Sequence, residues 1–270
     1  MCNVNMLYDG LAGLNRYAMP LLATWRMAIA RAPTLDDVPF TKDEVVTQAD
    51  EILRLGLATG KDIKNVPDIV YTFRARADLP AEILANGHYA IVGRGKGRYA
   101  FVRIPRPNRF PAVPAQLRRE RVISRVPAWA GEYLGFDEQC MLSSVNTNDL
   151  VALHLGLRSA IQLQPHRRTT VQGWGQVELD GWYVGEGRDA THVGIAIEAK
   201  DEATGDRLNV SQLFGGALAL RQDFPQLQQR LIGAKPSGGG RIMMCEFSVP
   251  DDVRDLREVS EWVEYELVVR

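Results

Sequence analysis

Two charged side chains stand two positions apart at the end of an apolar run. Residues 191–205 read THVGIAIEAKDEATG, and Glu198 and Lys200 follow small and β-branched residues typical of a buried strand. Side chains alternate along a strand, so these two share one face. They form either a solvated surface ion pair, which contributes about 0–1 kcal/mol, or half of a site in which an acid and a base act together.

A second run supplies a further carboxylate. Residues 177–180 read VELD, so Glu178 and Asp180 share the face opposite to that of the apolar residues between them. Eighteen positions separate Asp180 from Glu198, which leaves room for a turn through GEGRDA between antiparallel strands. We therefore expect Asp180, Glu198 and Lys200 to converge at one end of a sheet.

Two carboxylates and a lysine suit the hydrolysis of a phosphodiester. Carboxylate oxygens are ligands that Mg²⁺ prefers, and the ion neutralises phosphate charge and helps to deprotonate a water. A neighbouring lysine orients that water or stabilises the pentacoordinate phosphorus. Three widely spaced cysteines and four scattered histidines form no cluster for a softer metal.

The order of these residues resembles the PD-(D/E)xK nuclease superfamily, which includes type II restriction endonucleases and Holliday-junction resolvases. Asp180 precedes the Glu198-Ala199-Lys200 motif, and Gln212 follows in the next helix. The resemblance covers roughly residues 145–225.

By this resemblance, Asp180, Glu198, Lys200 and Gln212 are the catalytic residues of an endonuclease that cuts double-stranded DNA with Mg²⁺. Asp180 and Glu198 are its metal ligands. The literal PD is absent, because Leu179 precedes Asp180.

Two further acids have open roles. Glu178 either helps to bind metal or is an exposed strand residue. Family members often carry an acid on the helix before the aspartate strand, and Asp149 is the nearest candidate. Asp149 is equally a favourable charge in the first turn of a helix.

These residues require an α/β fold, which we expect to be a restriction-endonuclease-like mixed β-sheet flanked by helices. The pattern predicts a helix from Thr41 with Glu44 completing a capping box, and a helix over 146–164. A hairpin over 88–105 follows the N-terminal helices, which is the order of a winged-helix domain. We predict a mainly helical, winged-helix-like DNA-binding domain over 1–104, a proline-rich linker over 105–115, and the nuclease domain over 116–270.

Charge is unevenly distributed in a chain of net charge −1. Residues 88–130 hold ten basic side chains and one acid, whereas the last twenty residues hold seven acids and three arginines. A local basic block is what a polyanion-binding surface needs, although a solvated arginine-rich stretch has the same composition. The predicted DNA contacts are Arg94, Lys96, Arg98, Arg118, Arg119, Arg167 and Arg168.

We expect a type II restriction enzyme that acts as a homodimer, with one site for each DNA strand. The alternatives are a structure-specific repair or resolvase-type nuclease and, from another class, a non-catalytic winged-helix DNA-binding regulator. The chain has no long apolar run for a membrane span and no secretion signal, so a cytoplasmic protein is expected.

Overall fold

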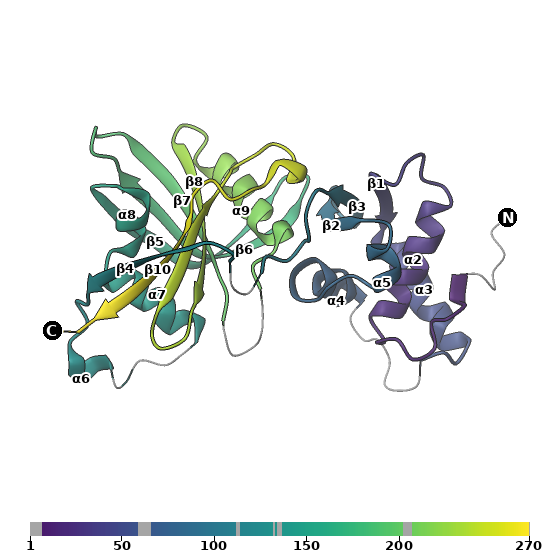
Figure 1. Cartoon of the computed structure of the whole chain (residues 1–270). Helices are drawn as coiled ribbons and strands as arrows, with labels where there is room; N and C mark the ends of the chain where they lie inside the picture. Colours follow the sequence, from purple (N-terminus) through teal and green to yellow (C-terminus); the bar gives the residue numbers. More distant parts are fainter. Residues whose placement is uncertain are drawn as a thin grey trace. The chain divides into compact units, whose positions relative to one another are not determined.

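The computed structural model describes residues 7–58, 66–111, 114–131, 133, 137–201 and 207–269. They form two compact units: one spans 1–108 with 172–175, and the other spans 109–171 with 176–270. Figure 1 labels the helices and strands of both. In the described part of the chain, no helix combines the length and apolar character that crossing a bilayer requires.

The first unit is a group of helices and a small antiparallel sheet with strand order β1-β3-β2. Its elements, in chain order, are α2 (Ala18–Ile29), β1 (Asp37–Thr41), α3 (Lys42–Arg54), α4 (Val66–Tyr71), a π-helix (Thr72–Arg76), α5 (Ala81–Leu84), β2 (His88–Gly93) and β3 (Arg98–Ile104). The predicted hairpin over 88–105 is therefore β2 and β3. Gly95 and Gly97 turn its tip with φ values of +104° and +68°.

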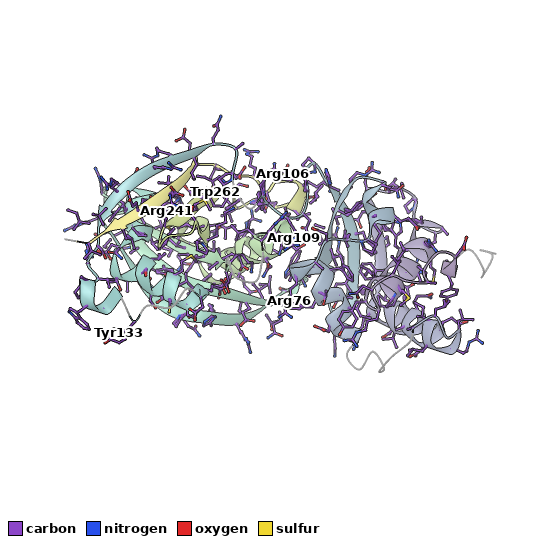
Figure 2. The ribbon with its side chains drawn as sticks, turned by 60° about the horizontal axis from the view of Figure 1, so that its bottom comes forward. Arg76, Arg106, Arg109, Tyr133, Arg241 and Trp262 are labelled. Carbon is purple, nitrogen blue, oxygen red and sulfur yellow. The ribbon has the colours of Figure 1, made fainter. Side chains whose placement is uncertain are left out.

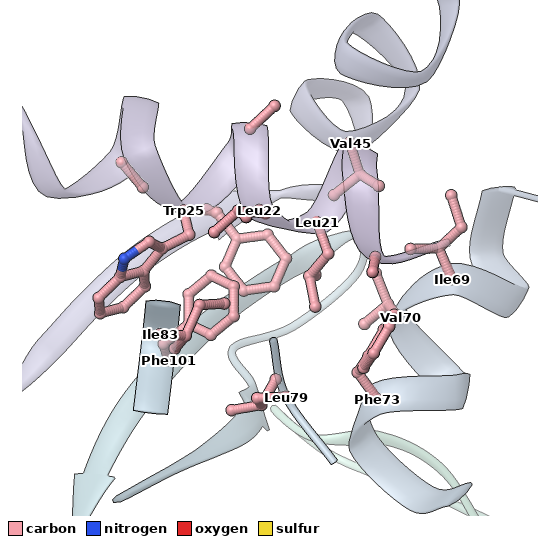
Figure 3. Close-up of a cluster of buried hydrophobic side chains, with 14 of the residues drawn as sticks. Leu21, Leu22, Trp25, Val45, Ile69, Val70, Phe73, Leu79, Ile83 and Phe101 are labelled. Carbon is pink, nitrogen blue, oxygen red and sulfur yellow. The ribbon is translucent and has the colours of Figure 1, made fainter. Parts of the chain in front are cut away.

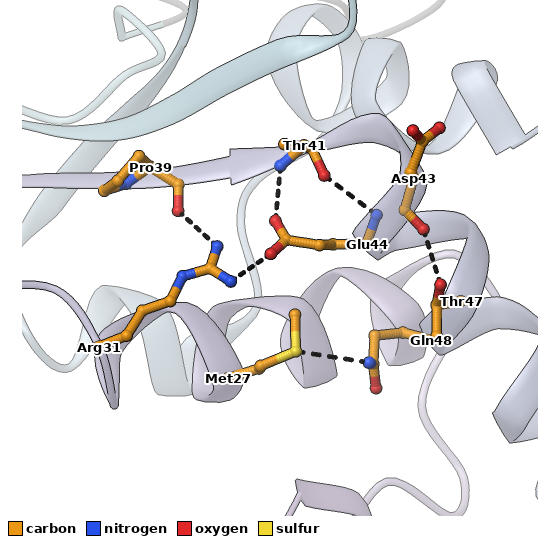
Figure 4. Close-up of polar contacts among 8 residues, drawn as sticks. All are labelled: Met27, Arg31, Pro39, Thr41, Asp43, Glu44, Thr47 and Gln48. Carbon is orange, nitrogen blue, oxygen red and sulfur yellow. Dashed lines mark hydrogen bonds and ion pairs between the residues drawn. The ribbon is translucent and has the colours of Figure 1, made fainter.

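The capping box predicted for α3 is present (Figure 4). Thr41 Oγ1 accepts a hydrogen bond from the Glu44 amide at 3.2 Å, and Glu44 Oε2 accepts one from the Thr41 amide at 2.7 Å. Arg31 forms an ion pair with the same carboxylate. Two orphan amides at the helix start are thus satisfied.

The core of the first unit lies between its helices and its sheet (Figure 3). Leu21, Trp25, Ile69 and Phe101 are buried there, and the rings of Trp25 and Phe101 meet edge to face with centroids 5.1 Å apart. Burial of these side chains from α2, α4 and β3 holds the unit together.

The second unit is built on a seven-stranded mixed sheet in the order β4-β10-β9-β8-β7-β6-β5. Pairs β4–β10 and β7–β8 are parallel, and β10–β9, β9–β8 and β7–β6 are antiparallel, which confirms the predicted α/β class. The strands are β4 (Leu117–Ile123), β5 (Ser159–Val171), β6 (Gly175–Glu186), β7 (His192–Ala199), β8 (Gln228–Pro236), β9 (Ile242–Phe247) and β10 (Trp262–Val268); the helical segments are α6 (Ala128–Gly131), α7 (Glu138–Thr147), α8 (Leu150–Leu155), α9 (Val210–Asp223) and a 3₁₀ turn (Val253–Asp255).

The helix predicted over 146–164 is wrong beyond Leu155. Gly156 adopts a left-handed conformation, with φ +65°, and ends α8. Residues 159–171 then form strand β5 beside β6. Pairing with a strand farther along the chain overrides the local helical preference of this stretch.

Helices cover both faces of the sheet. Side chains of α7 and α8 pack with Ile195, Ile197 and their neighbours on one face. On the other face lies α9, where Phe224 approaches Gly194 so closely that an added Cβ would meet its ring at 2.4 Å. The small residue at position 194 thus reflects a tightly packed neighbour.

The boundary between the units falls inside the predicted linker, between Asn108 and Arg109. Phe110 is buried in the second unit, where its ring meets that of Phe247 edge to face at 5.0 Å. Lys235 Nζ donates to the Pro111 carbonyl at 2.7 Å. Residues 109–111 are therefore part of the second unit; the predicted linker positions 112 and 113 lie outside the described residues.

The stability of the second unit should depend on His154. Burial, followed by Arg118 and Arg230, lowers the pKa of this imidazole to about 4, and its Nδ1 lies 3.1 Å from the Tyr265 hydroxyl. Below about pH 6.5 the imidazole of His154 is protonated in the unfolded chain but stays neutral in the folded chain. The free energy of unfolding therefore decreases as pH falls, by roughly 3 kcal/mol at pH 4. Urea unfolding from pH 8 to 4 should show a weaker pH dependence for His154→Gln than for wild type.

The matched control is His192→Gln, because His192 is exposed at the start of β7. It should follow the wild-type curve. Equal pH dependence of wild type and His154→Gln would show that His154 does not remain neutral in the folded chain.

Candidate functional site

Strands β6 and β7 bring the predicted acids together. Their antiparallel register ends with Gly181 paired to Ile197, the residues next to Asp180 and Glu198. Asp180 Oδ2 accepts a hydrogen bond from the Ala199 amide at 2.7 Å. The expectation that these strands are neighbours with Asp180 beside the Glu198 motif is therefore confirmed.

Glu198 and Lys200 form a buried ion pair. Lys200 Nζ lies 2.7 Å from Glu198 Oε1, and the two residues are 6% and 2% exposed. The Lys200 amide also donates to the Ala234 carbonyl at 3.0 Å, which continues the pairing with β8. The alternative of a solvated surface ion pair is therefore wrong, because both side chains are buried. Burying two charges is unfavourable unless they are closely paired, as these two are.

A third carboxylate comes from Glu138, which the sequence analysis missed. It is the first residue of α7, whose N-cap Asp137 accepts a hydrogen bond from the Cys140 amide at 2.8 Å. The Glu138 and Asp180 carboxyl groups lie within hydrogen-bonding reach of each other. The signal that could have revealed it is the helix-start pattern of residues 137–140, DEQC.

The carboxyl groups of this cluster oppose each other's ionisation. Burial, followed by the neighbouring Glu138, raises the pKa of Asp180 to about 7, although the Ala199 amide and Lys200 act to lower it. Burial also raises the pKa of Glu138. Glu138, Asp180 and Glu198 together could carry three negative charges beside the single ammonium of Lys200, and this mutual repulsion favours the protonated form of Asp180 and Glu138.

The start of α9 lies at the same end of the sheet as this cluster. Gly233 pairs with Glu198, and a Cβ added to Gly233 would meet Leu208, which lies just before α9. Phe224, at the other end of α9, instead packs against Gly194 at the far end of β7. The N-cap Asn209 forms two hydrogen bonds with Gln212. Its Oδ1 accepts from the backbone amide of Gln212 at 2.9 Å, and its Nδ2 donates to Gln212 Oε1. Gln212 thus occupies the predicted helix start, fixed by Asn209.

The two acids whose roles the sequence left open, Glu178 and Asp149, each pair with an arginine. Glu178 is exposed and pairs with Arg168, whose Nη2 is 2.9 Å from Glu178 Oε1. Asp149 precedes α8 with φ +52° and forms an ion pair with Arg125. Glu178 is thus an exposed strand residue, and the helical acid that lies beside Asp180 is Glu138 rather than Asp149.

Several predicted DNA-binding arginines are paired with acids. The basic and acidic blocks meet where β4 runs beside β10: Arg119 Nε lies 2.9 Å from Glu264 Oε2, and Arg118 lies 2.6 Å from Glu120. Arg241, labelled in Figure 2, is a second partner of Glu264 at 3.4 Å. Much of the charge of this basic block is therefore neutralised within the second unit.

Of the other predicted DNA-binding residues, some pair with acids and some have no ion pair among the described residues. Arg167 pairs with Asp223, and Arg94 pairs with Asp37 at 2.6 Å. At the tip of the β2–β3 hairpin, Lys96 and Arg98 are exposed, and no ion pair links either to another described residue. The hairpin tip therefore carries the most available positive charge among the predicted contacts.

The donor set of the cluster fits a hard cation. Among the described residues, no three His, Cys, Asp or Glu side chains are arranged as a metal-binding group. Mg²⁺ is commonly held by one or two carboxylates and completes its octahedron with water, so a site of this ion would not need a third protein carboxylate.

Comparison with protein-family models, with curated proteins and with solved structures finds no match to this chain in any of the three.

Removing Lys200 should destabilise the metal-free protein. In Lys200→Met the Glu198 carboxylate stays buried without its ammonium partner, which costs roughly 3–5 kcal/mol. The double variant Glu198→Gln/Lys200→Met should recover to within about 2 kcal/mol of wild type, because no charge is left unpaired. Urea unfolding in the presence of EDTA measures both free energies.

Arg168→Met provides the control, because its partner Glu178 and Arg168 itself are both exposed. It should change the free energy of unfolding by less than about 1 kcal/mol. Equal losses for Lys200→Met and Arg168→Met would contradict the burial of the Glu198–Lys200 pair.

Proposed function

We propose that the chain is a Mg²⁺-dependent endonuclease that hydrolyses phosphodiester bonds of double-stranded DNA. The observation that carries the proposal is the convergence of Asp180, Glu198 and Lys200 at one buried end of a mixed sheet. These residues occupy the strands on which the PD-(D/E)xK pattern requires them. The second unit would accordingly have a restriction-endonuclease-like fold.

Each residue has a distinct role in this proposal. Asp180 and Glu198 would hold Mg²⁺, which supplies positive charge at the phosphate and lowers the pKa of a bound water. The Ala199 amide fixes Asp180 through Oδ2, and Lys200 fixes Glu198 through Oε1. Both carboxylates are therefore oriented before substrate arrives.

The ammonium of Lys200 lies beside the carboxylate of Glu198. It would orient the attacking water or stabilise the charge that develops on phosphorus. Glu138 adds negative charge against Asp180 and would strengthen cation binding. Gln212, fixed by Asn209 at the start of α9, would orient a ligand or a phosphate oxygen.

The first unit would position the DNA. Its order of one helix, one strand, further helices and a hairpin, together with its sheet order β1-β3-β2, resembles a winged-helix domain, with β2 and β3 as the wing. Lys96 and Arg98 at the wing tip carry exposed positive charge for phosphates.

A sequence-specific type II restriction enzyme is the subclass that we favour by the resemblance. A repair or resolvase-type nuclease would use the same cluster, and the products of cleavage separate the two. Discrete fragments from a plasmid indicate site-specific cutting, whereas preference for branched substrates indicates repair.

The proposal predicts Mg²⁺-dependent cleavage of plasmid DNA that is abolished by EDTA. Asp180→Asn and Lys200→Ala should each lower the cleavage rate by roughly 10²–10³-fold or more, because each removes a group that stabilises the transition state. Both variants should still bind duplex DNA in a gel-shift assay without Mg²⁺, so that loss of cleavage is distinguished from loss of binding.

Glu178→Gln is the matched control, since Glu178 lies on the same strand as Asp180 but is exposed. It should cleave at the wild-type rate. DNA binding by wild type with no Mg²⁺-dependent cleavage would contradict the endonuclease and would favour a non-catalytic DNA-binding regulator.

A further inference from the structure

Residues 109–111 lie alongside the residues that lead into α9. Arg109, labelled in Figure 2, forms an isolated antiparallel β-bridge with Asn209, and the Phe110 amide donates to the Leu208 carbonyl at 2.8 Å. Asn209 is the N-cap of α9. The bridge therefore places an arginine directly beside the residue that begins this helix.

The side chains of this segment alternate between two sides. Phe110 and Leu208 are 5% and 1% exposed, and the Phe110 ring meets that of Phe247 edge to face at 5.0 Å. Because successive side chains of an extended chain point to opposite sides, Arg109 and Asn209 lie on the side away from this apolar contact. Arg109 is accordingly half-buried, whereas Phe110 is part of the core.

Arg109 lies next to the contact between Asn209 and Gln212. Opposed residues of an antiparallel pair have their Cβ atoms about 5 Å apart on the same side. Asn209 in turn accepts from the Gln212 amide at 2.9 Å and donates to Gln212 Oε1. A cationic side chain is therefore placed beside Gln212, to which the proposed function assigns a metal ligand or a phosphate oxygen.

A buried lysine fixes the same segment to the end of the sheet that carries the carboxylate cluster. Lys235 Nζ donates to the Pro111 carbonyl at 2.7 Å and lies 4.5 Å from the centre of the Trp262 ring. Lys235 directly follows Ala234, whose carbonyl accepts from the Lys200 amide at 3.0 Å. Since Lys235 is 8% exposed, its ammonium anchors the segment rather than facing solvent.

We propose that Arg109 binds a backbone phosphate of the DNA at this site. A guanidinium donates two parallel hydrogen bonds to phosphate oxygens, and such contacts fix the position of the duplex without reading its sequence. The bridge to Asn209 and the bond from Lys235 to Pro111 hold the backbone of Arg109 in place before DNA arrives. The inference rests on the proposed function, because it names a residue that holds the substrate of that site.

The salt dependence of duplex binding tests this contact. Fluorescence anisotropy of a labelled DNA duplex with the full chain in EDTA measures binding without cleavage. Each phosphate that a protein cation neutralises adds about 0.9 to the slope of log K against log salt concentration. Arg109→Gln should therefore lower the slope by about one and weaken binding roughly tenfold.

Arg109→Lys separates the charge from the shape of the side chain. It should keep the wild-type slope, because the positive charge remains, and bind less tightly than wild type, because an ammonium lacks the planar fork of a guanidinium. Circular dichroism of each variant verifies that the substituted chain is folded. A lower slope for Arg109→Lys than for wild type would contradict a role that depends on charge.

Arg158→Gln is the matched control. The Arg158 side chain is 72% exposed, and its amide donates to the carbonyl of Glu186 at 2.8 Å. Glu186 pairs with His192 at the start of β7, which is the end of the strand opposite to Glu198. Arg158→Gln should keep both the slope and the affinity of wild type.

Cleavage kinetics separate a role in binding from a role in the chemical step. With Mg²⁺ and protein in excess over plasmid, Arg109→Gln should need about tenfold more protein for its half-maximal rate and should reach nearly the wild-type maximum. Lys200→Ala should instead have a lower maximum, because it acts on the reacting groups.

The outcomes for this inference and for the proposed function are distinguishable. A slope for Arg109→Gln equal to that of wild type would overturn the inference alone if wild type cleaves DNA, and so would an equal loss of slope in Arg158→Gln. Wild type that binds duplex without cleaving it, together with a lower slope for Arg109→Gln, would contradict the endonuclease and leave the phosphate contact in place. Wild type that binds no duplex would overturn both.

Discussion

Negative charge buried at the end of β6 and β7 is the constraint on which the rest of the second unit depends. Asp180 and Glu138 face each other within hydrogen-bonding reach, and Glu198 has Lys200 as a buried partner. Burial is unfavourable for each ionised group, and a single ammonium cannot neutralise three carboxylates. A fold with such a cluster is less stable than the same fold with neutral side chains at these positions. A loss of stability of this kind is common where a site must bind a cation or react.

The sheet and its two helical layers impose this arrangement. Antiparallel pairing of β6 with β7 runs to Gly181 and Ile197 and brings Asp180 beside the Glu198 motif, and Glu138 of α7 lies near Asp180. The opposite face is covered by α9, and Phe224 at its end packs so closely on Gly194 that a side chain there would clash.

The sequence predicted those parts of the site that are local. Glu198 and Lys200 are two residues apart, and Asp180 lies on the adjacent strand, so alternation alone placed them together. Glu138 was missed because its contact with Asp180 spans 42 positions and joins a helix to a strand. The ion pairs of Arg119 and Arg121 could not be predicted either, since their partners Glu264 and Glu266 lie on β10, more than 130 residues later. Strand β5 was taken for helix because its identity depends on pairing with β6.

The most direct test of the account is the effect of Mg²⁺ on thermal unfolding of wild type and of Asp180→Asn. Without metal, Asp180→Asn should unfold at a higher temperature than wild type, because an amide can donate to Glu138 where a second carboxylate repels it. Added Mg²⁺ should raise the unfolding temperature of wild type and leave that of Asp180→Asn nearly unchanged, since a cation stabilises only the state that binds it. A wild-type unfolding temperature that does not respond to millimolar Mg²⁺, together with an Asp180→Asn variant less stable than wild type, would contradict a cation-binding role for the cluster.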